Sequence, residues 1–212
     1  DTSLLVCPAS LVYNWENEFR KFAPDLSIQL IVGNEKEREE RLQEWKQYDV
    51  LITSYDLLRR DRSRYEGMNF RFQVIDEAQY IKNDQTQNAK AVKAIQAKTR
   101  YALTGTPVEN HLGELWSIFD YLMPGFLGSS RKFREKFEQP IVKQSDQKAM
   151  ERLHKMTAPF LLRRTKKEVL PELPEKLEEV VYAHMEGEQE KLYRASVLKL
   201  QEELEEAPEL TG

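Results

Sequence analysis

Five short apolar segments, rich in β-branched residues, recur along the first half of the chain and are separated by stretches with helical spacing. Within each segment apolar residues follow one another without alternating with polar ones, which is typical of strands buried on both faces. We expect strands at residues 3–7, 27–32, 49–53, 72–76 and 99–103. The sequence therefore predicts an α/β fold with a parallel sheet that helices cover on both faces.

The segments between these strands carry helix signals. Ser10 stands where an N-cap is expected, Pro24 ends the same helix, and two further helices are expected at 35–47 and 86–97. One face of the first helix is apolar and is formed by Val12, Trp15, Phe19 and Phe22.

Beyond Pro107 the pattern becomes helical. An apolar stripe covers residues 112–122, and the tail at 188–206 predicts an amphipathic helix. Further elements are expected as helices at 131–137 and 146–156 and as a strand at 177–184.

The composition excludes several classes of protein. The 212 residues carry a net charge of -4, so any contact with DNA has to come from local basic patches. The single cysteine, Cys7, cannot form an internal disulfide and reads as a small core residue. No apolar run approaches membrane-spanning length, and a cytoplasmic, nucleoid-associated protein is expected.

Polar clusters follow four of the expected strands. Because the carboxyl ends of parallel strands meet at one edge of a sheet, these clusters are expected to lie together. They are Pro8-Ala9-Ser10, Ser54-Tyr55, Asp76-Glu77 and Thr104-Gly105-Thr106.

Asp76 and Glu77 follow an apolar strand, where Asp76 suits a magnesium ion bound through water and Glu77 suits the activation of an attacking water. Taken alone, so short a pair fits an ordinary strand end or turn better than a catalytic site. The cluster at Thr104–Thr106 alone fits an ordinary strand-to-helix turn better, but the occurrence of both clusters after apolar strands weighs against coincidence.

The densest basic group contains Arg163 and Arg164 and is followed by Lys166 and Lys167. It fits either the binding of DNA phosphates or a solvated helix end. A phosphate loop of the form G-x-x-x-x-G-K-[ST] is not found in the chain, because none of its 8 glycines is followed by lysine.

Several of these segments resemble the motifs of the Swi2/Snf2 family. Residues 5–11 with Trp15 and Phe19 resemble motif Ia, and residues 52–56 resemble the motif Ib region. Asp76-Glu77-Ala78-Gln79 resembles motif II in a bacterial or archaeal form. LTGTPVEN at 103–110 resembles motif III, and FLLRRTKKEVLPELPEK at 160–176 resembles the block that leads to the second lobe.

The resemblance implies a RecA-like lobe of a superfamily 2 translocase, which moves along double-stranded DNA with ATP and Mg2+. Asp76 and Glu77 then handle magnesium and water, and coupling of hydrolysis to movement falls to Gln79, Thr104, Gly105 and Thr106. The DNA contacts fall to Pro8, Ala9, Ser10, Ser54 and Tyr55, with Arg163 and Arg164 as further candidates.

The resemblance also divides the chain. Residues 1–110 correspond to the lobe 1 core, 111–158 to a helical protrusion, 159–176 to the linker block and 177–212 to the start of lobe 2. It places motif I upstream of Asp1 and the arginine fingers in the second lobe. This chain alone is therefore expected to be inactive and to bind neither ATP nor Mg2+ tightly.

The place of the motif I strand inside the family's sheet leads to one more expectation. Without that strand, the chain is expected to self-associate or to have a rearranged first strand. The client complex that the parent protein remodels is left unspecified.

Two alternatives stay open beside the translocase lobe. A non-catalytic DNA- or protein-binding module derived from this fold is one, although both motif II acids and motif III are present. An RNA helicase of the DEAD-box kind is the other, although Ser-Ala-Thr is expected there in place of Thr104-Gly105-Thr106.

Overall fold

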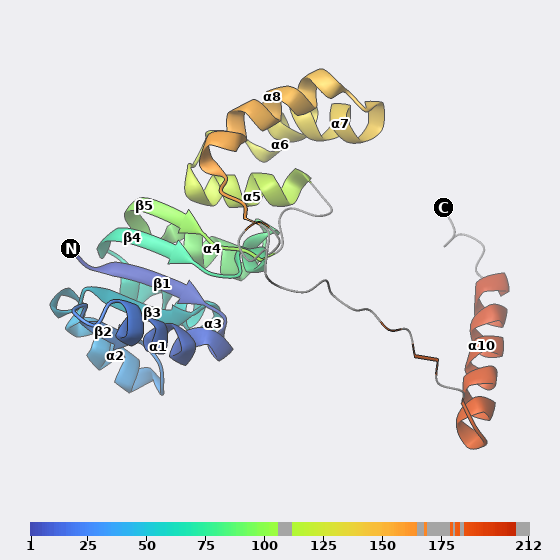
Figure 1. Ribbon diagram of the computed structural model, residues 1–212, viewed down its shortest axis with the longest axis horizontal. Helices are drawn as coiled ribbons and strands as arrows, with labels where there is room; N and C mark the ends of the chain where they lie inside the picture. Colours follow the sequence, from blue (N-terminus) through green and yellow to red (C-terminus); the bar gives the residue numbers. More distant parts are fainter. Residues whose placement is uncertain (106–111, 165–167, 169–178, 180, 183–184, 207–212) are drawn as a thin grey trace. The chain divides into compact units, whose positions relative to one another are not determined.

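A parallel sheet of five strands organises the N-terminal part of the molecule (Figure 1). The computed structural model describes residues 1–105, 112–164, 168, 179, 181–182 and 185–206. The strands are β1 (Ser3–Cys7), β2 (Ile28–Leu30), β3 (Val50–Ser54), β4 (Asn69–Ile75) and β5 (Gln96–Ala102), in the spatial order β2-β3-β1-β4-β5. The expected α/β fold with a parallel sheet is confirmed.

Helices connect the strands. The longer ones are α1 (Val12–Phe22), α2 (Glu35–Gln43), α3 (Tyr55–Arg60) and α4 (Gln87–Ala94). Short 3-10 turns lie beside them, as η1 (Ala9–Leu11), η2 (Trp45–Gln47), η3 (Arg62–Tyr65) and η4 (Ala78–Ile81).

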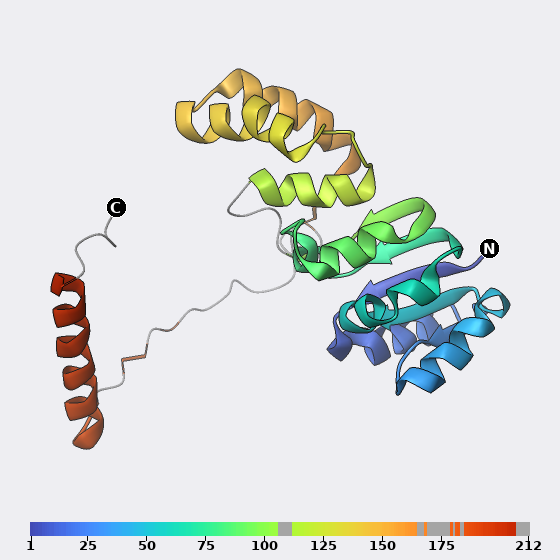
Figure 2. The ribbon, with the colours of Figure 1, turned by 180° about the vertical axis from the view of Figure 1, so that it is seen from behind.

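The central strands β1 and β3 are buried on both faces, as the lack of polar alternation predicted, whereas no residue of the edge strand β5 is buried. On one face Leu5 and Cys7 of β1 pack in a cluster with Val12, Trp15 and Phe19 of α1. On the other face Leu4 and Val6 join a larger cluster, whose other members come from α3, α4 and neighbouring segments. Figures 1 and 2 show α1 in front of the sheet and α3 and α4 behind it.

A helical region with its own small core follows the sheet. Its helices are α5 (Leu112–Leu122), α6 (Ser130–Phe133), the π-helical turn η5 (Arg134–Glu138), α7 (Gln139–Gln144), α8 (Gln147–Thr157) and the 3-10 turn η6 (Ala158–Phe160). Helix α5 joins this region to the sheet, because Phe119 packs in the helical core whereas Tyr121 packs in the core of the sheet. Two hydrogen bonds secure this connection, from Ser117 Oγ to the Ile81 carbonyl at 2.6 Å and from the Tyr121 hydroxyl to the Gln73 carbonyl at 3.0 Å.

The chain divides into two compact units, residues 1–161 and 162–212. This division falls inside the expected linker block, and the finer division into four segments stays a prediction. The described part of the second unit contains α10 (Glu188–Glu206), which confirms the expected tail helix. The strand expected at 177–184 falls mostly outside the described residues, and residues 179, 181 and 182 form no strand. Among the described helices, none has the length and apolar character that crossing a membrane requires.

The boundary between α4 and β5 lies earlier than the sequence predicted. Helix α4 ends at Ala94 and β5 begins at Gln96, so the expected helix end at residue 97 is wrong. Arg100 accounts for the early end: its guanidinium donates to the Ile95 carbonyl at 2.7 Å and to the Tyr121 carbonyl at 2.8 Å. A side chain of the following strand thus satisfies a carbonyl at the helix end, which helical spacing does not reveal.

Two expectations about the first helix are also wrong. Ser10 lies inside the 3-10 turn η1 and α1 begins at Val12, so its hydroxyl does not cap the helix. Phe22, in the last turn of α1, is 70% exposed and is absent from the cluster in which Val12, Trp15 and Phe19 pack.

The first strand is fully formed, which contradicts the expected rearrangement of the N-terminal strand. Residues of β1 pair with β3 on one side and with β4 on the other. Strand β5 pairs with β4, and Tyr101 in β5 and Leu103 just after it are 50% and 41% exposed. The expectation of self-association stays a prediction.

A buried ion pair joins α2 to the residue that follows α3. The guanidinium of Arg38 donates to both carboxylate oxygens of Asp61, at 2.5 and 2.9 Å, and both side chains are at most 7% exposed. This hydrogen-bonded carboxylate raises the pKa of Arg38. Two opposite charges are therefore held together in a poorly solvated place, where each depends on the other for its stabilisation.

We expect the substitution Asp61→Ala to lower the free energy of unfolding by about 3–5 kcal/mol in urea, because it leaves the buried Arg38 without its carboxylate. Asp56→Ala is the matched control: its carboxylate pairs with Arg59 at 3.2 Å but is 63% exposed. That control should lose less than about 1 kcal/mol. Equal losses in the two variants would contradict the assignment.

Candidate functional site

The polar clusters predicted from the sequence come together at the carboxyl edge of the sheet. The strand register pairs Cys7 with Ser54, Val6 with Ile75, and Ile75 with Ala102. The residues that follow these positions therefore lie beside one another, although they are far apart in the sequence. Two backbone hydrogen bonds continue the pairing past the strands, from Asp76 N to the Val6 carbonyl and from Leu103 N to the Ile75 carbonyl, both at 2.8 Å.

Asp76 and Glu77 form a sharp turn at the end of β4. The Glu77 N–H donates to Asp76 Oδ1 at 2.8 Å, and Glu77 has left-handed backbone angles, with φ 52° and ψ 57°. Such angles are unfavourable for a residue with a Cβ atom. The left-handed residue leads directly into the 3-10 turn η4, and both half-buried carboxylates stay at the edge of the sheet.

Gln79 links the two predicted coupling segments. Its Nε2 donates to Glu77 Oε2 at 2.6 Å, and its Oε1 accepts from the Thr104 hydroxyl at 3.1 Å. A continuous chain of hydrogen bonds therefore runs from the Glu77 carboxylate to the end of β5. Gly105 lies beyond Thr104 with open space where a Cβ would stand, and Thr106 falls outside the described residues.

Two aromatic residues contact Asp76 in a way that sequence reasoning missed. Trp15 donates its indole N–H to Asp76 Oδ2 at 2.9 Å, and the Tyr55 hydroxyl donates to the Asp76 carbonyl at 2.7 Å. The ring of Tyr55 also stacks on Tyr80, with centroids 5.0 Å apart. The available signal was the position of Trp15 on the apolar face of its helix, and it indicated core packing without identifying the polar partner.

The structure corrects the expected role of Ser54 and Tyr55 as side chains that face DNA. Each residue is 2% exposed, and the Ser54 hydroxyl accepts from Leu57 N to cap α3. Burial raises the pKa of the Tyr55 hydroxyl well above its ordinary value, so the group stays a neutral donor toward Asp76. By contrast, Ala9 and Ser10 are exposed and Pro8 is half-buried at the same edge of the sheet.

Cys7 ends β1 beside this site and is a core residue, as the sequence predicted. Its side chain is fully buried, and burial together with the charge of Asp76 raises the pKa of the thiol to about 12. A thiol that stays protonated at neutral pH is a poor nucleophile.

The two carboxylates fit a magnesium ion that keeps most of its water. Mg2+ is usually held by one or two carboxylates together with substrate phosphates and water. Asp76 and Glu77 supply such a pair at the sheet edge, and the residues that the structure describes contain no cluster of three or more metal-binding side chains.

Arg163 and Arg164 belong to the second compact unit, close to its beginning. Both side chains are exposed. They are accessible to a polyanion, as the prediction requires.

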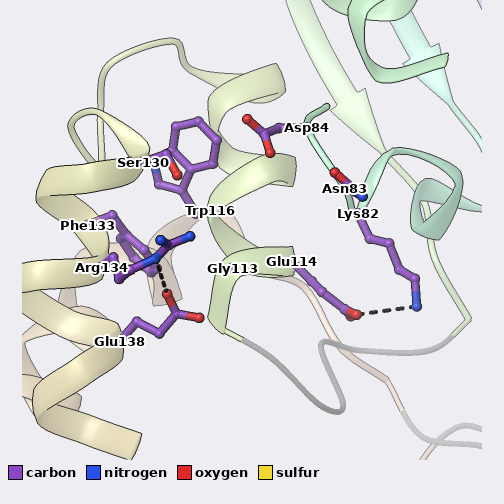
Figure 3. A pocket seen from close by; sticks show the side chains of 10 residues that line it. All are labelled: Lys82, Asn83, Asp84, Gly113, Glu114, Trp116, Ser130, Phe133, Arg134 and Glu138. Atoms are coloured by element: carbon purple, nitrogen blue, oxygen red, sulfur yellow. Dashed lines mark ion pairs between the residues drawn. The ribbon is translucent and has the colours of Figure 1, made fainter. Parts of the chain in front are cut away.

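A separate pocket lies between the segment after η4 and the helical region (Figure 3). Its volume is about 250 Å³, and Asp76, Glu77 and Gln79 do not line it. Four charged side chains in its wall form two ion pairs, Lys82 with Glu114 at 3.3 Å and Arg134 with Glu138 at 3.4 Å. The pocket is thus lined by residues of both the segment after η4 and the helical region, and the charges of these four side chains are already paired.

The left-handed backbone at Glu77 leads to a stability prediction. Glycine adopts this conformation without strain, so Glu77→Gly should be more stable than Glu77→Ala by about 1 kcal/mol in urea unfolding. Ser145, with φ 52°, should show the same order. At Lys90, inside α4 and exposed, the order should reverse, with glycine about 1 kcal/mol less stable than alanine. The same order at all three positions would contradict the interpretation.

Comparisons with known proteins show which family the chain resembles in sequence and fold. A family model described as SNF2-related domain matches residues 1–208. The TATA-binding protein-associated factor MOT1 of Saccharomyces cerevisiae is 41% identical over 202 residues, which cover 90% of this chain and 11% of that protein. An uncharacterized ATP-dependent helicase of Mycoplasma genitalium is 44% identical over 191 residues, covering 90% of this chain and 18% of the helicase.

A solved structure of the Sulfolobus solfataricus SWI2/SNF2 ATPase core in complex with dsDNA is similar over the whole chain. The TM-score is 0.74 and the identity 42%, and the match covers 43% of that structure's chain. The fold is thus the RecA-like fold of this ATPase core, and the chain spans only a minor part of the proteins it matches. On its sequence and its fold, the chain belongs to the Snf2 family of ATP-dependent helicase-like proteins.

Proposed function

We propose that this chain is the magnesium- and water-handling part of lobe 1 in an ATP-dependent translocase acting on double-stranded DNA. The observation that carries the proposal is the hydrogen-bonded series Asp76, Glu77, Gln79 and Thr104 at the carboxyl edge of the sheet. This series joins the two carboxylates suited to hydrolysis to the end of the neighbouring strand.

Each member of the series has a distinct task in this proposal. Asp76 orients magnesium through its water shell, and the ion supplies charge neutralisation at the phosphates when ATP is bound. Glu77 orients the attacking water and accepts its proton. Gln79 contacts both Glu77 and Thr104, so a change at the Glu77 carboxylate during hydrolysis alters the contacts of the segment at Thr104–Thr106. Hydrolysis is thereby coupled to movement.

DNA is proposed to lie against the segment Pro8–Ser10. This segment follows β1 at the same edge, and Ala9 and Ser10 are exposed there. A similar ATPase core is known in complex with dsDNA, which supports duplex DNA as the partner. Arg163 and Arg164 are proposed as additional phosphate contacts.

A complete motor needs more than this chain provides. The chain contains no G-K pair for a phosphate loop, and the similar ATPase core is more than twice as long. We therefore propose that ATP and Mg2+ bind tightly only when a phosphate-loop segment and a second RecA-like lobe are joined to this chain. The localisation and the client complex follow from the parent protein.

The test compares the 212-residue chain with a protein that also contains the phosphate-loop segment and the second lobe. The longer protein should hydrolyse ATP with stimulation by double-stranded DNA, and Glu77→Gln should lower the rate by about 100-fold or more while ATP still binds. Glu18→Gln, on the exposed side of α1, is the matched control. Robust turnover by the short chain, or full activity of Glu77→Gln, would contradict the proposal.

The proposed phosphate contacts lead to a separate prediction. In the longer protein, replacing Arg163 and Arg164 by alanine should reduce the slope of log affinity against log salt by roughly two, about one for each lost contact. Arg194→Ala is the control, because Arg194 pairs with Glu190 at 2.7 Å within α10. An unchanged slope in the double variant would show that these two residues do not contact DNA phosphates.

A further inference from the structure

The Asp76 carboxylate is held by two donors from different parts of the chain. Its Oδ1 accepts the Glu77 N–H at 2.8 Å, and its Oδ2 accepts the Trp15 indole N–H at 2.9 Å. Two donors on two oxygens determine the plane of a carboxylate, and each oxygen keeps a lone pair for a further partner. The orientation of Asp76 is therefore set before any ion or water binds.

Trp15 is fixed by its own packing. It lies on α1, packs in a cluster with Cys7 and Val12, and places its ring 6.0 Å from that of Phe19. The indole is half-buried, and its N–H is directed at an acid on another element 61 positions away in the chain. A hydrogen bond to a charged acceptor is among the stronger kinds and resists displacement by water.

The position of Trp15 links two functional segments. Helix α1 follows directly on the turn η1, which contains the exposed residues Ala9 and Ser10. From Asp76 the hydrogen bonds continue through Glu77 and Gln79 to Thr104. A displacement of η1 and α1 thus moves the donor that orients the magnesium carboxylate.

We propose that Trp15 is a positioning residue: its indole N–H holds the Asp76 carboxylate in the orientation that water-bridged magnesium requires, and it transmits DNA contact at residues 8–10 to that carboxylate. The roles of magnesium and DNA in this statement rest on the proposed function. The contact itself does not, and it can be tested separately. Outer contacts of this kind typically change metal affinity or activity by 10–100-fold when they are removed.

The first experiment tests the contact in the 212-residue chain. The chain has 3 tryptophans, so 15N labelling of the indoles should yield three N–H signals, with that of Trp15 assigned by its loss in Trp15→Phe. Asp76→Asn should shift the Trp15 signal and leave that of Trp116 in place, because the Trp116 N–H donates to the Gly128 carbonyl at 2.9 Å. An unmoved Trp15 signal would overturn the proposal.

The second experiment tests the role in the longer protein that hydrolyses ATP. Trp15→Phe should raise the Mg2+ concentration for half-maximal hydrolysis by 10–100-fold, weaken Mn2+ binding to the nucleotide complex to a similar extent and reduce the stimulation by DNA. Affinity for double-stranded DNA should change by less than about twofold, because the indole itself is not placed on DNA. Trp116→Phe is the matched control, since it also removes a buried indole donor but leaves Asp76 untouched.

A further variant guards against misfolding. Benzothienylalanine at position 15 keeps the bicyclic ring and lacks the N–H donor, so it should reproduce the effect of Trp15→Phe with the packing intact. Normal magnesium dependence in this variant would overturn the positioning role. If the indole signal responds to Asp76→Asn but the longer protein has no DNA-stimulated ATPase, the proposed function fails and the positioning of Asp76 remains.

Discussion

The structure depends on the position of β1 between β3 and β4. This strand pairs on both sides, and its alternate residues pack in the two separate clusters that cover the sheet. Its register also brings Cys7, the last residue of the strand, beside Ser54 and level with Asp76, because parallel strands have their carboxyl ends on the same side. The geometry of the site is therefore a consequence of strand pairing, and the core residues of β1 are as important to it as the polar residues that follow.

The turn at Asp76 and Glu77 shows how local strain and long-range contacts combine. A left-handed glutamate is unfavourable by itself, and it is retained here by a buried strand before it and by hydrogen bonds around it. Trp15 and Tyr55 restrain Asp76 from one side, whereas Gln79 connects Glu77 to Thr104 on the other. Both carboxylates are thus preorganised, and a charged site with fixed dipoles needs little reorganisation during a reaction.

Much of the fold was predictable because it rests on local patterns. The strand at 3–7 and the helix at 188–206 were confirmed at both ends, since apolar runs and helical spacing are written directly in the sequence. The errors have tertiary causes. The end of α4 depends on Arg100, a residue of the next strand, and Ser10 fails as a cap because a 3-10 turn precedes α1. Ser54 and Tyr55 were expected on the surface, but α3 begins there and turns both side chains inward.

The sequence by itself determined the parallel α/β class, the family and the acids at the end of β4, because residue type and spacing carry that information. The tertiary structure alone decided which groups touch those acids. No spacing rule connects Trp15 to Asp76 or Arg38 to Asp61, since each pair lies on separate elements whose approach is set by the packing of helices on the sheet. The orientation of the Asp76 carboxylate depends on such a pair, because the donor that holds its Oδ2 comes from a helix 61 positions away in the chain.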